Sequence, residues 1–198
     1  MEENNTQIEG KARYKKPLWM RIILGLVFIV MVSSGILYLC WRAGYPLVYV
    51  NNTKSTAKGI YVREFTGDLY IGGYVIMRLP KTYGKLQKGS LLLKQVQAFP
   101  GYEYIREGNM LLVRSKRYPL STDARMPQIP QGKHIVPDGM ILLLNERNNS
   151  FDGRYIGPVS QDTIVARVRL VFNKEIFWEH EKRLHERLKA LLPGVFRG

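Results

Sequence analysis

Two residue types in this chain could together attack a carbonyl carbon, a serine as nucleophile and a lysine as its base. A serine hydroxyl is a poor nucleophile near neutral pH and needs a positioned base to take its proton. Lysine can do this only as the neutral amine, and burial lowers the pKa of a lysine because it disfavours the charged form. Lys94 follows three leucines and precedes Gln95-Val96, so we expect its strand to lie in the core or in a cleft wall.

Ser55 is the candidate nucleophile, and it lies in a polar, turn-like segment at residues 51–61. Lys54 and Lys58 are rival bases in the same segment. Solvation there would keep both charged, and the alternating side-chain direction of an extended chain carries Lys54 away from Ser55. Taken alone, Ser55 is better explained as an ordinary hydroxyl and Lys94 as a solvated surface charge.

Three ordered segments change that balance. They read Asn51-Asn52-Thr53-Lys54-Ser55-Thr56-Ala57-Lys58-Gly59-Ile60-Tyr61, then Ser90-Leu91-Leu92-Leu93-Lys94 leading to Phe99-Pro100-Gly101, and Val136-Pro137-Asp138-Gly139 leading to Ser150-Phe151-Asp152-Gly153-Arg154-Tyr155-Ile156-Gly157. Together they resemble the signal peptidase I superfamily. The first and last segments are most similar to its conjugative-transfer branch, the TraF-type peptidases that mature plasmid pilin precursors. The resemblance covers roughly residues 51–171.

The resemblance implies a role for each matching residue. Ser55 would be the nucleophile and Lys94 its general base, and Thr53 with the Ser55 amide would bind the oxyanion. Asp152 is a third candidate catalytic residue, since TraF-type enzymes have been discussed as using this aspartate.

Two further residues would support this site. Ser150 matches the hydroxyl that orients the lysine amine, and Arg154 matches the partner of Asp152 in a structural ion pair. The chain departs from the family pattern without losing a reacting group. The departures are Ala57 for proline, Gln95 for arginine, Tyr102 for aspartate, Gly153 for serine, and Leu144-Asn145-Glu146 where Gly-Asp-Asn is usual.

No cofactor or metal is expected. The three histidines, His134, His180 and His185, have no spacing that suits a metal, and we interpret them as structural or solvated. A Ser/His/Asp triad that uses His134 is the alternative arrangement for catalysis.

The elements that must position these residues are mostly strands. Short β-prone runs are broken by Gly, Pro, Asn and Asp, and they lie at residues 47–50, 73–79, 90–98, 110–113, 140–144 and 163–172. Residues 121–133 are predicted to form a surface loop. The pattern predicts an antiparallel, mainly β domain, a coiled sheet or partly open barrel of the signal-peptidase type.

One apolar segment precedes this domain. Residues 22–41 contain no charge, and about 20 helical residues match a hydrocarbon core of roughly 30 Å. A cleaved secretory signal is the alternative, but the end of the apolar segment lacks a small-x-small cleavage site. Five Lys and Arg residues precede the span, namely Lys11, Arg13, Lys15, Lys16 and Arg21, against Arg42, Lys54 and Lys58 after it. This bias predicts that the N-terminus lies inside.

The C-terminal segment, residues 174–192, has a different pattern. It places Phe177, Leu184, Leu188 and Leu191 near one helical face, and Pro193-Gly194 would stop the helix. Such an amphipathic helix would pack on the β domain, lie on a membrane or meet a partner helix. The predicted organisation is therefore a cytoplasmic tail (1–21), a transmembrane helix (22–41), an extracytoplasmic peptidase domain (42–173) and a C-terminal helix with its tail (174–198).

Composition agrees with a membrane neighbour. The chain has 198 residues and a formal net charge of +14, without nucleic-acid-binding motifs, and its only cysteine, Cys40, permits no intramolecular disulfide. The predicted function is a single-pass serine endopeptidase of a bacterial cytoplasmic membrane, with its catalytic domain on the periplasmic face. Its partners would be the bilayer and a precursor substrate, a conjugative propilin above all. The alternatives are a general signal peptidase I and a non-catalytic bitopic scaffold of a conjugation or secretion apparatus. The sequence leaves open whether the product is hydrolysed or cyclised, and it leaves open the oligomeric state.

Overall fold

The computed structural model describes residues 17–123 and 125–191, and the chain divides into two compact units at Pro46 and Leu47. The first unit contains helix α1 (Leu18–Arg42), which encloses the predicted apolar span. None of its residues is buried, and its apolar window has a mean hydropathy of 2.6. By length and composition α1 is able to cross a membrane.

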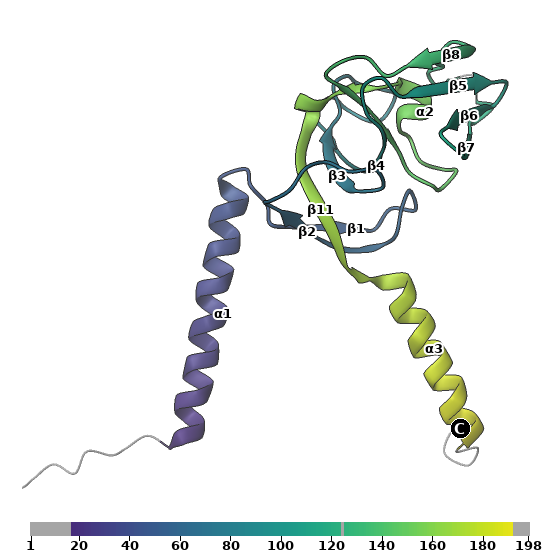
Figure 1. Cartoon of the computed structure of the whole chain (residues 1–198). Coiled ribbons are helices and arrows are strands. Elements are labelled where there is room, and N and C mark those ends of the chain that lie inside the picture. Colours follow the sequence, from purple (N-terminus) through teal and green to yellow (C-terminus); the bar gives the residue numbers. More distant parts are fainter. Residues whose placement is uncertain (1–16, 124, 192–198) are drawn as a thin grey trace, which may run out of the picture. The chain divides into compact units, whose positions relative to one another are not determined.

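The second unit is built on an open, curled sheet of seven strands (Figure 1). Its order is β1 (Val48–Asn51), β2 (Gly59–Glu64), β11 (Ile164–Asn173), β3 (Tyr74–Arg78), β4 (Leu91–Ala98), β9 (Met140–Leu144) and β10 (Val159–Ser160). All neighbouring strands are antiparallel, and β1 and β10 are the edge strands of the sheet. The predicted mainly β, partly open architecture is confirmed.

A second antiparallel sheet of four strands packs beside the first. Its order is β7 (Lys116–Pro119), β6 (Met110–Val113), β5 (Glu103–Glu107) and β8 (Gly132–Ile135). Tyr104 and Leu111 of this sheet share one buried cluster with Leu142 and Leu144 of β9. This shared core fixes the end of β9, from which the chain continues into the segment that carries Ser150.

All six predicted strands are present, as β1, β3, β4, β6, β9 and β11, and for β6 and β9 the predicted bounds agree with the observed ones. Five strands were not predicted, namely β2, β5, β7, β8 and β10. Most of them alternate charged with apolar residues or are very short, so their own pattern is weak and pairing with neighbours decides them. The predicted loop at residues 121–133 is two residues too long, because β8 begins at Gly132.

Two short helical elements and a long helix complete this unit. Helix α2 (Gly153–Ile156) follows Asp152, whose side chain accepts a hydrogen bond from the backbone N–H of Arg154. A 3-10 turn, η1 (Gln161–Thr163), precedes β11. Helix α3 (Lys174–Leu191) confirms the predicted C-terminal helix. Leu192, the Pro193-Gly194 stop and the side chains of Leu188 and Leu191 lie outside the described residues.

Candidate active site

Ser55 lies in the loop between β1 and β2, and Asn51 holds this loop in shape. The Oδ1 of Asn51 accepts hydrogen bonds from the backbone N–H of Thr53 at 3.1 Å and from its Oγ1 at 2.7 Å. The Nδ2 of Asn51 donates to the Ala57 carbonyl at 3.0 Å. Because Asn51 is the last residue of β1 and is itself buried, the edge of the sheet positions the loop.

The Ser55 hydroxyl lies 2.8 Å from the Thr53 hydroxyl. The single proton of Thr53 Oγ1 is already donated to Asn51, so Ser55 is the donor in this pair. The hydrogen-bonded series from Ser55 through Thr53 to Asn51 thus orients the hydroxyl of Ser55, a half-buried residue.

Lys94 lies on β4 and is only 3% exposed. Its Nζ donates to Ser150 Oγ at 2.8 Å. Burial lowers the pKa of Lys94 to about 8; the charge of Asp152 opposes this shift and that of Arg154 adds to it. A lysine in this setting supplies a neutral amine at a far lower pH than a solvated one.

Ser55 and Lys94 line the same groove, of about 370 Å³. Thr53 and Asn51 line it too, and its apolar wall includes Leu92. The structure therefore brings the predicted nucleophile and the predicted base to one cavity from strands that are separated in the sheet by β11 and β3.

Asp152 and Arg154 form a buried ion pair with no exposed side-chain surface. Arg154 Nε lies 2.8 Å from Asp152 Oδ1, and its Nη2 lies 3.1 Å from Oδ2. Asp152 Oδ2 also accepts the backbone N–H of Asn145 at 3.0 Å. Both carboxylate oxygens are thus engaged within the pair and its surroundings, which fixes the segment from Ser150 to Arg154 against the end of β9.

Two asparagines that the sequence reasoning did not assign belong to this arrangement. Asn51 lies inside the first segment that resembles the family, so its position in the sequence could have indicated a role in the site. Asn145 is fully buried, and its Nδ2 donates to the Leu93 carbonyl at 3.0 Å. It was noted only as a departure from the family pattern, and nothing in the sequence indicated that it links β4 to Asp152.

The histidines lie elsewhere. His134 of β8 stacks on Tyr104 at 5.2 Å and is bonded to the Pro130 carbonyl, and it is not among the residues that line the groove. His180 and His185 are exposed on α3. Within residues 17–123 and 125–191, no cluster of three His, Cys, Asp or Glu side chains has metal-binding geometry.

Comparison with known proteins shows the family of this chain. A family model described as signal peptidase, peptidase S26, matches residues 19–173, well over half of the chain. A crystal structure of a signal peptidase I from Enterococcus faecalis V583 is 17% identical, with a TM-score of 0.36, and the match covers 52% of this chain and 98% of that one. A comparison with curated proteins finds no significant match.

The chain belongs to the signal peptidase family S26, and this assignment rests on the family model. It is therefore a membrane-associated serine peptidase that processes precursor proteins. The resemblance to the signal peptidase superfamily is confirmed, whereas its conjugative-transfer branch stays a prediction.

Proposed function

We propose that this protein is a membrane-anchored endopeptidase in which Ser55 is the nucleophile and Lys94 the general base. One observation supports this most strongly: the buried amine of Lys94 lines the same groove as the Ser55 hydroxyl. With a pKa of about 8, roughly a tenth of the Lys94 amines are neutral at pH 7. Ser150 Oγ accepts a hydrogen bond from the Lys94 amine and so orients the lone pair of that amine.

In the proposed reaction the precursor lies extended along a sheet edge, with its scissile carbonyl over Ser55. Neutral Lys94 takes the Ser55 proton as the oxygen attacks the carbonyl carbon, and a tetrahedral oxyanion forms. Lys94 then gives this proton to the leaving amine, which leaves an acyl-enzyme on Ser55. Water, deprotonated by Lys94, hydrolyses the ester and restores the Ser55 hydroxyl.

The Ser55 amide and the Thr53 hydroxyl are the proposed oxyanion donors. In the free protein the Thr53 hydroxyl donates to Asn51, so it must rotate toward the substrate to act in this way. Losing one such donor costs about 3 kcal/mol of barrier in other serine peptidases. Asp152 would act on Lys94 through its charge, since its oxygens are occupied by Arg154 and Asn145.

For the substrate we propose a conjugative pilin precursor. This rests on the resemblance of the first and last segments, Asn51 to Ser55 and Ser150 to Gly157, to TraF-type peptidases. We further propose that the N-terminus is cytoplasmic and that the catalytic unit lies on the periplasmic face of a bacterial cytoplasmic membrane. Co-expression with propilins and with general secretory precursors, followed by intact mass of the products, separates pilin maturation from general signal-peptide removal and detects cyclisation.

The catalytic roles are tested by substitution in the full chain. Ser55→Ala and Lys94→Ala are each expected to lower precursor cleavage by at least about a thousandfold, because each removes a member of one proton-transfer pair. Lys54→Ala, which removes the exposed neighbour of Ser55, is the matched control and should cleave normally. A small serine-directed electrophile should add one adduct to the native protein and none to Ser55→Ala. Cleavage retained by either dyad variant would refute the proposal, and absence of any cleavage and any adduct would favour the scaffold.

A further inference from the structure

Helix α3 is joined to the β domain through its first turn. The backbone N–H of Lys174 donates to the Lys58 carbonyl at 2.8 Å, and Glu175 forms an ion pair with Arg147. Beyond Glu175 every described side chain of α3 is exposed. An isolated helix of this length is marginal in water, so a second surface is expected to cover α3.

An exposed aromatic cluster marks the start of this helix. The rings of Phe172 and Phe177 lie 5.5 Å apart, and those of Phe177 and Trp178 lie 5.8 Å apart. Their residues are 39%, 50% and 54% exposed, and Leu184, which shares a face with Phe177, is 58% exposed. Tryptophan and phenylalanine beside leucine are typical of the buried face of an interfacial helix.

Most of the acidic residues of α3 lie on one side of the helix. At 3.6 residues per turn, Glu175, Glu179 and Glu186 fall on the side opposite Phe177 and Leu184. These carboxylates would therefore point away from whatever covers the apolar face.

The basic residues flank the apolar face on both sides. Arg183 and Arg187 lie along one border and Lys189 lies beside Trp178 on the other, whereas Lys182 lies nearer the carboxylates. Glu181 is the one acidic residue of the described helix on the apolar side. A helix with cations at both borders of its apolar face and carboxylates on the opposite side matches a surface with an apolar interior and negatively charged groups at its boundary with water.

We propose that α3 lies in the headgroup layer of an anionic bilayer, with Phe177, Trp178 and Leu184 in the acyl region and the flanking cations on lipid phosphates. A second copy of α3 fits this arrangement less well. Two such helices that met along their apolar faces would bring their cationic borders together, and like charges at helix neighbours repel.

This docking would reach the candidate active site through the first turn of α3. Lys58 follows Ser55 by three residues, and Arg147 precedes Ser150 by three, so α3 is bonded to both segments that carry the site. Its orientation in the headgroup layer therefore sets the orientation of the groove toward a membrane-bound precursor. This consequence rests on the proposed function, whereas the docking itself does not.

Trp178 reports the docking directly. In the full chain with Trp19→Phe and Trp41→Phe, Trp178 is the only tryptophan. The protein is reconstituted in vesicles of brominated phosphatidylcholine, with or without phosphatidylglycerol, because bromine quenches only fluorophores that enter the acyl region. Strong quenching is expected with phosphatidylglycerol at low salt, and weaker quenching without it or at high salt.

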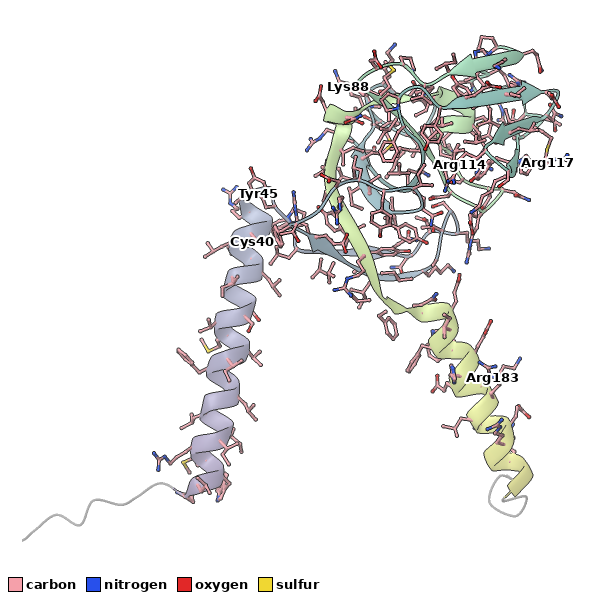
Figure 2. The ribbon with its side chains drawn as sticks, in the orientation of Figure 1. Cys40, Tyr45, Lys88, Arg114, Arg117 and Arg183 are labelled. Atoms are coloured by element: carbon pink, nitrogen blue, oxygen red, sulfur yellow. The ribbon has the colours of Figure 1, made fainter. Side chains whose placement is uncertain are left out.

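A charge reversal separates the flanking cations from net charge. Arg183→Glu with Arg187→Glu should lower the ratio of docked to undocked helix on the order of tenfold or more. Lys88→Glu with Arg117→Glu is the matched control, since it makes the same charge change on other elements of the unit (Figure 2) and should leave quenching intact. The proposal would be overturned by absence of quenching with phosphatidylglycerol or by an equal loss of quenching in both double variants. It would also be overturned if the Trp178 signal depended on the amount of protein per vesicle instead of on the lipid, which would favour a second copy.

The consequence for catalysis has its own readout. The Arg183→Glu and Arg187→Glu variant should cleave a membrane-inserted precursor several-fold more slowly but a soluble peptide at the native rate. Normal quenching with no cleavage by the native protein would refute the proposed function alone. Lost quenching with unchanged precursor cleavage would refute the coupling of α3 to the site.

Discussion

Opposing effects on one amine decide whether Lys94 can act as a base. Burial favours the neutral form, the nearby Asp152 carboxylate favours the charged form, and the Arg154 guanidinium again favours the neutral form. Burial is the largest of the three, so the pKa falls to about 8 instead of rising. Since Arg154 pairs with Asp152 at 2.8 Å, the pair as a whole presents little net charge to the lysine.

The pH dependence of cleavage follows from this pKa. Below about pH 8 the Lys94 amine is mostly protonated and cannot take the Ser55 proton, so kcat/KM should fall about tenfold per pH unit. Above about pH 8 it should level off. A kcat/KM profile with a soluble peptide measures this, and a profile that stays flat from pH 6 to 9 would contradict it.

Asn145 offers a sharper version of the same test. Asn145 directly follows β9, and its neutral side-chain amide donates to the carbonyl of Leu93, the residue before Lys94. In Asn145→Asp a second carboxylate would stand beside the ammonium, and the acid limb of kcat/KM should move to higher pH. A merely destabilised variant would lose activity at every pH without a shift of the limb.

At the scale of elements, the Ser55 hairpin is attached to the rest of the domain through β11. Ten residues long, β11 pairs with β2 along one side and with β3 along the other, and it shifts register between Leu170 and Phe172. At that shift β2 and β11 come very close, and a Cβ on Gly59 would lie 1.9 Å from the Phe172 carbonyl oxygen. Only a glycine fits between these backbones.

Gly59→Ala is therefore expected to separate β2 from β11 and to lower the free energy of unfolding by several kcal/mol. It should also lower cleavage, because Ser55 lies in the loop that β2 closes. Thermal unfolding and peptide cleavage measure the two effects. Gly35→Ala in α1, where an added Cβ meets no atom within 4 Å, is the control. Equal stability of the two variants would show that the close approach is unimportant.

At the scale of the whole molecule, the candidate site is assembled from distant parts of the chain. Lys94 and Ser150 are 56 residues apart, and β11 from the end of the domain lies between β2 and β3. The groove is therefore complete only after the C-terminal strand has paired, which is a pairing of high sequence separation.

The proposed membrane orientation is tested on the whole chain. In a Cys40→Ser background, a cysteine at exposed position 115 should react with a membrane-impermeant maleimide in intact bacterial cells. A cysteine at position 6 should react only after lysis, because the basic residues before α1 favour a cytoplasmic N-terminus. The opposite labelling pattern would reverse the proposed orientation.

Features that depend on local pattern were predicted from the sequence. The long apolar run became α1, the short apolar runs at residues 110–113 and 140–144 became β6 and β9, and the ordered segments around Ser55, Lys94 and Ser150 indicated the family. Each of these signals is carried by residues that are adjacent or regularly spaced in the chain.

Other features were decided by tertiary structure. Strands β2, β5 and β7 carry charged residues and owe their conformation to pairing, and α3 leaves the domain although its amphipathic pattern also fitted packing. Above all, the low pKa of Lys94 needs desolvation by residues far along the chain and the placement of Asp152 with Arg154. Desolvation and Coulomb interactions depend on distance in space, which a linear sequence does not contain until the strands have paired.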